Sequence, residues 1–278
     1  MSLFITSLNS GSNGNCYYIG NQNEAILIDA GISCREIEKR MKRLELNVWK
    51  VKAVFITHEH ADHISGVTTF IKKFNVPVYI TGTTLMHSRL RLKKELITSF
   101  RPYEPINVGN LSVVPFPKQH DASDPYSFIV NCNKINIGVF TDIGRPCNQL
   151  IKYFKQCHAA FLETNYDEQM LEKRIYPYVL KNRIRGGMGH LSNRQALEFF
   201  TTYKPAFMSH LFLSHLSENN NCPNLVYELF NRQAGNVKII VASRYQETAV
   251  YHIGHSGLSR LKKIHRSIGS SQLAFSFG

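Results

Sequence analysis

Four potential metal ligands lie within six residues of this chain, at positions 58 to 63. The sequence Thr-His-Glu-His-Ala-Asp-His at residues 57–63 follows the apolar, β-branched run 51–56, which predicts a short buried strand. Residues two apart share a face only in extended or turn geometry, because helical neighbours are three or four apart. We therefore expect a loop at the end of a strand that directs its ligands to one place. Imidazole suits Zn²⁺, and a carboxylate adds a harder oxygen ligand. The candidate ligands of this loop are His58, His60, Asp62 and His63.

Other polar residues follow apolar runs farther along the chain, and the ends of strands gather at one edge of a sheet. His120, Asp142 and His215 each come after such a run. His210 competes with His215, although it lies five residues upstream inside the predicted strand. Taken alone, each histidine is more typical of a buried, hydrogen-bonded core residue, but the loop at 58–63 needs further ligands from elsewhere in the chain.

The remaining pattern alternates between strands and helices. Strands are predicted at residues 2–8, 16–19, 25–28, 51–56, 78–80, 111–116, 127–130, 135–140, 159–162, 206–213, 237–241 and 247–253. Helices are predicted at 33–46, 64–74, 85–100 and 192–203. The cations of the 85–100 segment are expected to form a solvated helix face rather than a binding patch. Blocks of strands around an alternating region favour a four-layer sandwich over a Rossmann sheet.

Composition limits the class of protein. The net charge of +13 favours a polyanionic partner, nucleic acid first and an anionic membrane surface second. None of the six cysteines forms a Cys-x-x-Cys pair, so we expect reduced thiols in a cytoplasmic enzyme. We see no secretion signal and no apolar run long enough to span a membrane. These features argue against a periplasmic antibiotic-hydrolysing enzyme. We expect one catalytic domain over residues 1–255 and a basic tail or peripheral helix over 256–278.

The pattern His58-x-His60-x-Asp62-His63 after a buried strand resembles the signature of the metallo-β-lactamase superfamily. The segments 10–15, 189–193 and 213–220 are similar to those of its YycJ/WalJ-like group of stand-alone nucleases. This resemblance implies an α/β (α+β) fold, a four-layer αβ/βα sandwich of two mixed sheets packed face to face with helices outside. It also implies two divalent metal ions, Zn²⁺ or Mn²⁺. One would be held by His58, His60 and His120, the other by Asp62, His63 and His215, and Asp142 would bridge them.

Further residues gain expected roles from the resemblance. Asp29 would support the metal loop, although an Asp after an apolar strand can also simply cap the next segment. His190 follows a glycine-rich turn and would contact the scissile phosphate or protonate the leaving oxygen; the alternative is a capping or packing histidine. Asp62 or Asp142 would accept a proton. Contact with the substrate is expected from Lys181, Arg183 and Arg185, which lie among aromatic residues, and from Ser12, Asn15 and Asn165.

The predicted activity is metal-dependent hydrolysis of a phosphodiester bond. A bridging Asp142 argues against β-lactamases, whose sites lack that bridge. The interval from Asp142 to His190 is too short for the inserted domain of the mRNA-processing members, and the interval from His120 to Asp142 too short for a tRNA-clamping arm. A 5′→3′ DNA exonuclease is therefore expected. The alternatives are an RNA-processing nuclease, a phosphodiesterase acting on a small cyclic or nucleotide substrate, and a non-catalytic nucleic-acid-binding module.

Overall fold

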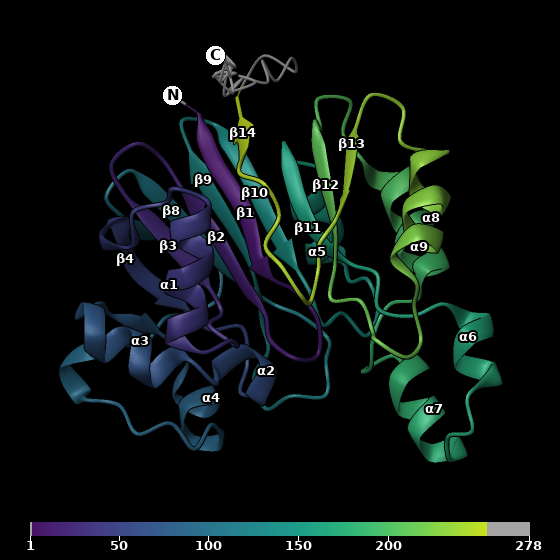
Figure 1. Ribbon diagram of the computed structural model, residues 1–278, viewed down its shortest axis with the longest axis horizontal. Coiled ribbons are helices and arrows are strands. Elements are labelled where there is room, and N and C mark those ends of the chain that lie inside the picture. Colours follow the sequence, from purple (N-terminus) through teal and green to yellow (C-terminus); the bar gives the residue numbers. More distant parts are fainter. Residues whose placement is uncertain (1, 255–278) are drawn as a thin grey trace, which may run out of the picture.

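The computed structural model describes residues 2–254, and these form two seven-stranded sheets packed face to face (Figure 1). The first sheet has the order β14 (Tyr251–Ile253), β1 (Leu3–Asn9), β2 (Cys16–Gly20), β3 (Ala25–Ile28), β4 (Val51–Phe55), β5 (Val78–Tyr79) and β6 (Ile97–Thr98). The second has the order β13 (Lys238–Val241), β12 (His210–Ser214), β11 (Ala159–Glu163), β10 (Ile135–Phe140), β9 (Tyr126–Cys132), β8 (Leu111–Pro117) and β7 (Ile106–Val108).

Helices cover the outer face of each sheet. Between strands β3 and β6 of the first sheet the chain forms α1 (Cys34–Arg43), the 3₁₀ turn η1 (Val48–Lys50), α2 (Ala61–Ile64), α3 (Val67–Phe74), α4 (Gly82–His87) and the 3₁₀ turn η2 (Lys94–Leu96). The second carries α5 (Asn148–Phe154), α6 (Glu168–Lys173), α7 (Tyr178–Arg185), α8 (Asn193–Tyr203) and α9 (Pro223–Asn231). Figure 1 shows α1 and α3 outside one sheet and α8 and α9 outside the other. The predicted four-layer αβ/βα sandwich is confirmed.

Three apolar clusters hold these layers together. The central cluster lies between the sheets and includes Phe55, Phe128 and Phe161. A second cluster joins the first sheet to α1 and α3, and a third joins the other sheet to α5, α8 and α9. Because the strands bury both faces, they consist largely of uninterrupted apolar residues.

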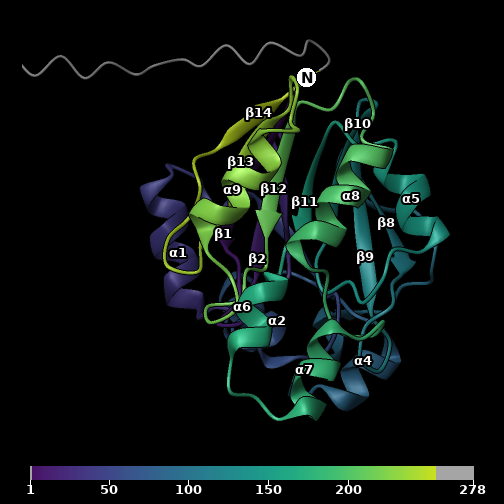
Figure 2. The same cartoon turned by 90° about the vertical axis from the view of Figure 1, so that its right-hand side faces the viewer.

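Each sheet places a row of parallel strands so that their carboxyl ends meet at one edge. β3, β4, β5 and β6 are parallel in the first sheet, and β10, β11, β12 and β13 are parallel in the second. In Figure 2, with the molecule turned by 90°, the strand ends again lie on the side of α2, α4 and α7. The polar residues that follow these strands are therefore brought to a common place.

Two predicted helices differ from the structure. The helix expected over 85–100 is wrong: α4 ends at His87, and the chain then runs without regular structure to η2 and β6. Leu90 and Leu92 both pack on the apolar cluster under α1 and α3, and this alternate spacing suits extended chain rather than helix. The helix expected over 64–74 is divided into α2 and α3 around Gly66. A Cβ at Gly66 would meet the Ile32 carbonyl oxygen at 1.9 Å, so the backbones approach too closely for any other residue.

Local signals explain where other elements begin. The Ser33 hydroxyl accepts the Glu36 N–H and starts α1, and Ser192 and Gln195 form a capping box at α8. The strand expected over 247–253 is shorter, since β14 begins at Tyr251. The basic segment before His190 forms α7, for which no helix was expected, and α5, α6, α9 and β7 were also not expected.

β14 closes the first sheet beside β1, in an antiparallel pairing that sets Leu3 opposite Ile253. Upstream of β14, the Thr248 hydroxyl accepts the Ser7 N–H and lies 3.0 Å from the Thr6 hydroxyl. All six cysteines are free. No helix within residues 2–254 is long and apolar enough to cross a membrane. The predicted tail over 256–278 lies outside the described residues.

Candidate metal centre

Seven side chains from both sheets converge at the common edge of the sandwich. His58 and His60 follow β4, and α2 carries Asp62 and His63. The second sheet contributes the three residues that follow β8, β10 and β12, namely His120, Asp142 and His215. Ligand atoms of His58, His60 and His120 lie within 4.8 Å of one another, and so do those of Asp62, His63 and His215. The structure thus brings together all seven of the predicted ligands.

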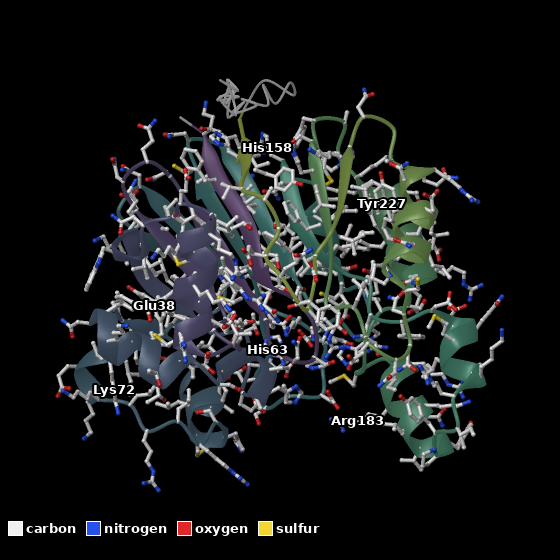
Figure 3. The ribbon with its side chains drawn as sticks, viewed as in Figure 1. Glu38, His63, Lys72, His158, Arg183 and Tyr227 are labelled. Carbon is white, nitrogen blue, oxygen red and sulfur yellow. The ribbon has the colours of Figure 1, made fainter. Side chains whose placement is uncertain are left out.

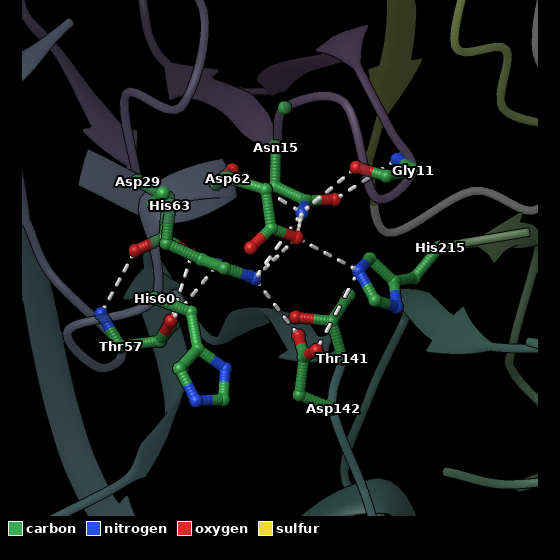
Figure 4. Close-up of polar contacts among 12 residues, drawn as sticks. Gly11, Asn15, Asp29, Thr57, His60, Asp62, His63, Thr141, Asp142 and His215 are labelled. Atoms are coloured by element: carbon green, nitrogen blue, oxygen red, sulfur yellow. Dashed lines mark hydrogen bonds and ion pairs between the residues drawn. The ribbon is translucent and has the colours of Figure 1, made fainter. Parts of the chain in front are cut away.

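Asp142 contacts residues of both clusters, and Figure 4 shows it beside His63 and His215. Its Oδ2 is 3.3 Å from His63 Nε2, whereas its Oδ1 is 3.5 Å from His215 Nε2 and 3.8 Å from His120 Nε2. His210, the alternative to His215, lies at the other end of β12, where its ring packs against Tyr251.

The donor set fits divalent metal ions. Asp142 Oδ2 is buried and, although it lies near His63 Nε2, accepts no hydrogen bond from residues 2–254. A buried carboxylate oxygen without a hydrogen bond is costly. His58 Nε2 faces His60 Nδ1 at 3.0 Å. Imidazole nitrogens and carboxylate oxygens that face one another around a small polar space are the ligands of zinc and manganese sites.

Electrostatics keep the carboxylates of the site ionised. Burial alone would raise the pKa of Asp142, but His215, His63 and Lys118 outweigh it and hold that pKa well below its usual range. At Asp62, burial would also raise the pKa, but the nearby histidines outweigh it and lower that pKa. The same carboxylates overcome burial at His63 and raise its pKa well above its ordinary value. Concentrated negative charge of this kind favours the binding of a cation.

Asp29 contacts two residues of the metal loop, Thr57 and His63. Its Oδ2 is 2.7 Å from His63 Nδ1, and its Oδ1 accepts the Thr57 N–H at 2.8 Å. The Thr57 hydroxyl donates to Asp29 Oδ2 at 2.8 Å. A carboxylate on Nδ1 fixes the orientation of a ligating imidazole and leaves Nε2 for a metal. This is the supporting contact that was expected of Asp29.

Three residues of the site have left-handed backbone conformations. The φ angles of Asp29, Asp142 and His215 are 59°, 56° and 59°. Each of them follows a strand directly or by one residue.

Glu163, at the end of β11, was not among the residues expected in the site. It is completely buried, and its carboxylate accepts the N–H groups of Ile143 at 2.8 Å and Leu191 at 3.0 Å. Its Oε1 lies 2.8 Å from His190 Nδ1 and 3.1 Å from His215 Nδ1. Burial would raise its pKa, but His190 and His215 lower it to about 2. An acid at the end of an apolar strand is the signal that also marks Asp142, and it could have identified Glu163.

His190 lies beside the clusters. Its ring centroid is 5.3 Å from that of His120 and 5.3 Å from that of His215. Because Glu163 contacts Nδ1, Nε2 remains for a substrate. A cavity of about 240 Å³ opens here; among its lining residues are Ser12, Asp62, Arg183 and His190.

Asn15 and Asn165, expected to contact the substrate, are instead buried beneath the ligands. The Asn15 amide lies 3.2 Å from both Asp62 Oδ2 and His63 Nε2. The Asn165 amide donates to the His215 carbonyl oxygen at 2.9 Å. Both contacts orient ligand residues.

The three cations expected to contact the substrate are each paired with an acid on the protein. Arg183 Nε lies 2.6 Å from Asp121 Oδ2 at the rim of the cavity. Lys181 and Arg185 both pair with Glu172, and neither lines the metal cavity. Figure 3 shows Arg183 on α7, apart from His63 on α2.

Comparisons with known proteins agree with this geometry. The model of the Metallo-beta-lactamase superfamily matches residues 10–124. The chain is 31% identical over 228 residues to Exodeoxyribonuclease YycJ from Bacillus anthracis, covering 81% of this chain and 86% of that protein. It is 28% identical to Exodeoxyribonuclease WalJ from Streptococcus pneumoniae, covering 79% of this chain and 84% of that protein.

Solved structures share the fold at low sequence identity. The metallo-beta-lactamase fold protein YhfI from Bacillus subtilis is 14% identical with a TM-score of 0.69, covering 91% of this chain and all of that one. Zn²⁺-bound PqqB from Methylobacterium extorquens is 14% identical with a TM-score of 0.67, covering 88% and 99%. The predicted resemblance is confirmed, and the chain belongs to the metallo-β-lactamase superfamily, alongside the YycJ and WalJ proteins.

Proposed function

We propose that this protein is a dinuclear metal-dependent nuclease that hydrolyses phosphodiester bonds in DNA, acting as a 5′→3′ exonuclease. The observation that carries the proposal is the position of Asp142 between two ligand clusters, with His190 beside them at an open cavity. The names of the YycJ and WalJ relatives support DNA as the substrate and exonuclease action. The net charge of +13 supports a polyanionic substrate.

The proposed metal ligands are the six side chains of the two clusters together with Asp142. His58, His60 and His120 would hold one Zn²⁺ or Mn²⁺ ion, and Asp62, His63 and His215 the other, with Asp142 shared. When bound, such ions supply a hydroxide at neutral pH and offset charge that develops on the phosphate oxygens. Asp62 would accept a proton; it lines the cavity, and its Oδ2 lies 3.3 Å from His215 Nε2.

His190 would donate a proton to the leaving oxygen. Its Nδ1 lies 2.8 Å from Glu163 Oε1, and this contact orients the ring. Arg183, on the cavity rim, would exchange its contact with Asp121 for a phosphate oxygen of the strand. Ser12 lines the same cavity and would contact the substrate there.

The test uses protein stripped of metal and reconstituted with Zn²⁺ or Mn²⁺. Single- and double-stranded DNA and RNA, each labelled at the 5′ or the 3′ end, are digested and the products sized. We expect release of 5′-terminal nucleotides from DNA in the presence of metal. RNA as the better substrate, or a small cyclic diester cleaved while long strands are not, would overturn the substrate assignment. Strands bound without turnover would indicate a binding module.

Two variants test the roles of the residues. Asp142→Asn should lose bound metal and turnover together. His190→Ala should retain metal and lose turnover by about 10²–10⁴-fold, the range of general acid–base catalysis. His87→Ala, at an exposed histidine of α4, is the matched control and should behave as the parent. DNA cleavage by His190→Ala at the parent rate would refute the role of His190.

A further inference from the structure

A second cavity lies on the other side of the wall of the metal cavity, near Arg244. Its volume is about 210 Å³, smaller than the roughly 300–1,000 Å³ of pockets for drug-sized ligands. Residues that are neighbours in the chain line the two cavities. Ser10 lines the new cavity and Ser12 the metal cavity; Leu216 lines the new one and His215 the other. The Ser10 hydroxyl accepts the His215 N–H at 2.8 Å, so the wall is held in place.

Arg244 lines this cavity, and its guanidinium is not fully paired. Among residues 2–254 its Nη1 has no hydrogen-bond partner and is shielded from solvent, while its Nη2 lies 3.4 Å from Glu218 Oε2. The Asn13 amide donates to the Arg244 carbonyl oxygen, which ties this segment to the loop after β1. In Figure 1 that loop and the chain between β13 and β14 lie at the same lower end of the sandwich. A buried donor without a hydrogen-bond partner costs free energy, and an acceptor on a ligand would remove that cost.

The other lining residues indicate which acceptor fits. Glu218 also accepts the Tyr245 hydroxyl at 2.9 Å, so its carboxylate stands at the rim and disfavours a phosphate. Leu216, Val241 and other apolar side chains form the walls. The Tyr245 ring is exposed, with the Arg244 guanidinium 5.9 Å from its centroid. Flat apolar faces with acceptors at one edge belong to nucleobases, and Arg commonly binds guanine O6 and N7.

We propose that this cavity receives one base of the DNA strand whose phosphate lies at the metal centre, an inference that rests on the proposed nuclease function. The Arg244 guanidinium turns towards the cavity and donates to a carbonyl oxygen or ring nitrogen of that base, and Tyr245 stacks on the base or on its neighbour. The subsite fixes the position of the strand relative to the scissile bond without contributing to the chemistry.

The experiment compares oligonucleotides that carry a single abasic residue at successive positions from the digested end. For the parent protein, one position should raise KM about tenfold relative to the intact strand, as expected when one base loses its stacking partner. Arg244→Met keeps the aliphatic stem and removes the donor, so the KM ratio of abasic to intact strand at that position should fall towards one. Tyr245→Ala, at an exposed side chain, should reduce the same ratio.

Arg232→Met is the matched control, because Arg232 is exposed on the C-terminal side of α9. It should keep the parent's KM ratio. A bis-aryl phosphodiester has no base, so its turnover by the parent reports on the metal centre alone. If that diester is hydrolysed and the KM ratio is the same in Arg244→Met, Tyr245→Ala and parent, the base subsite is refuted while the nuclease stands. If no diester or strand is hydrolysed, the failure lies with the proposed function.

Discussion

At the scale of single residues, the backbone of the site explains why its side chains point where they do. Asp29, Asp142 and His215 have φ between 56° and 59°, a region that L-residues seldom occupy. Asp and His tolerate it better than most residues, and an abrupt left-handed turn lets a side chain leave the strand end sideways. Three residues of the site thus adopt a backbone conformation that costs free energy.

Glu163 is a positioning residue whose charge can be tested. Glu163→Gln replaces one carboxylate oxygen with an NH₂ group. That group must face N–H donors such as that of Leu191, which is unfavourable. The side chain therefore no longer fixes the orientation of His190 and His215. We expect metal affinity or turnover to fall about 10–100-fold, the range for the partners of ligating residues. Metal content, kcat and the pH profile of kcat should be measured together. Glu198→Gln, on the exposed face of α8, is the control, and an unchanged pH profile in Glu163→Gln would contradict this role.

Two arginines of α7 can be distinguished by the same substitution. Arg183→Gln should raise KM for DNA and reduce the salt slope of binding by about one, because this arginine reaches the metal cavity. Arg185→Gln should change both less, since its guanidinium faces Glu172 away from that cavity. Binding titrations across a range of salt concentrations measure the slopes. Equal slopes for both variants would place the strand elsewhere.

At the scale of the elements, α1 secures the loop that follows β1. Arg40 is buried in α1, and its Nη1 donates to the Leu8 carbonyl oxygen at 2.7 Å and to Asn9 Oδ1 at 2.6 Å. The Asn9 amide in turn donates to the Gly14 carbonyl oxygen. A helix packed on the outside of a sheet thereby orders the loop that carries Ser12 and Asn15.

Removal of that guanidinium should destabilise the protein. Arg40→Met leaves the two buried acceptors without this partner. Each unsatisfied buried group costs at most about 1–3 kcal/mol of the free energy of unfolding. We expect a lower urea midpoint with an unchanged slope. Lys39→Met, at the neighbouring exposed position of α1, should change the free energy of unfolding by less than about 0.5 kcal/mol. An equal effect of both substitutions would contradict the role of Arg40.

The first residue of β12 should make stability sensitive to acid. Burial, with a smaller contribution from Lys238, lowers the pKa of His210 to about 4, whereas an unfolded histidine has a pKa of about 6.5. Between these values the unfolded chain binds a proton that the folded chain does not, so stability falls as the pH drops from about 6.5 to 4. His210→Gln should remove this part of the decrease, on the order of 2–3 kcal/mol. Urea titrations at pH 7 and pH 5 give the difference, and equal acid sensitivity of parent and variant would contradict it.

Sequence patterns predicted the strands and their polar ends well, because buried parallel strands are unbroken apolar runs and each ligand follows one. They failed where tertiary contacts decide the structure. The apolar residues of 85–100 indicate one face of a helix, but Leu90 and Leu92 pack on the core as extended chain. Glu163 carries the same signal as Asp142, but its role depends on His190 and His215, which are distant in sequence. The ion pairs of α7 cannot be read from composition either.

At the scale of the whole molecule, the metal centre joins the two sheets. His58, His60, Asp62 and His63 belong to the first half of the sandwich, whereas His120, Asp142 and His215 belong to the second. Metal bound between them contributes free energy to the folded chain, because the unfolded chain lacks the assembled site.

Chelation should therefore lower the melting temperature. Metal at a thousand times its dissociation constant stabilises a folded protein by about 4 kcal/mol, and this contribution is lost in EDTA. Thermal melts with and without EDTA measure the shift. Asp142→Asn should melt at nearly the same temperature with and without EDTA. If EDTA does not change the melting temperature of the parent protein, the metal site is refuted.

The pairing of β14 with β1 also affects how the protein is made. The partner of β1 along that edge is synthesised last among the described elements, so a growing chain carries an open strand edge until Ile253 has left the ribosome. That edge reads Leu-Phe-Ile-Thr-Ser-Leu-Asn, with no charge and no proline to deter pairing with a neighbouring chain. A premature stop before Tyr251 leaves this edge of β1 permanently unpaired, and the product should precipitate.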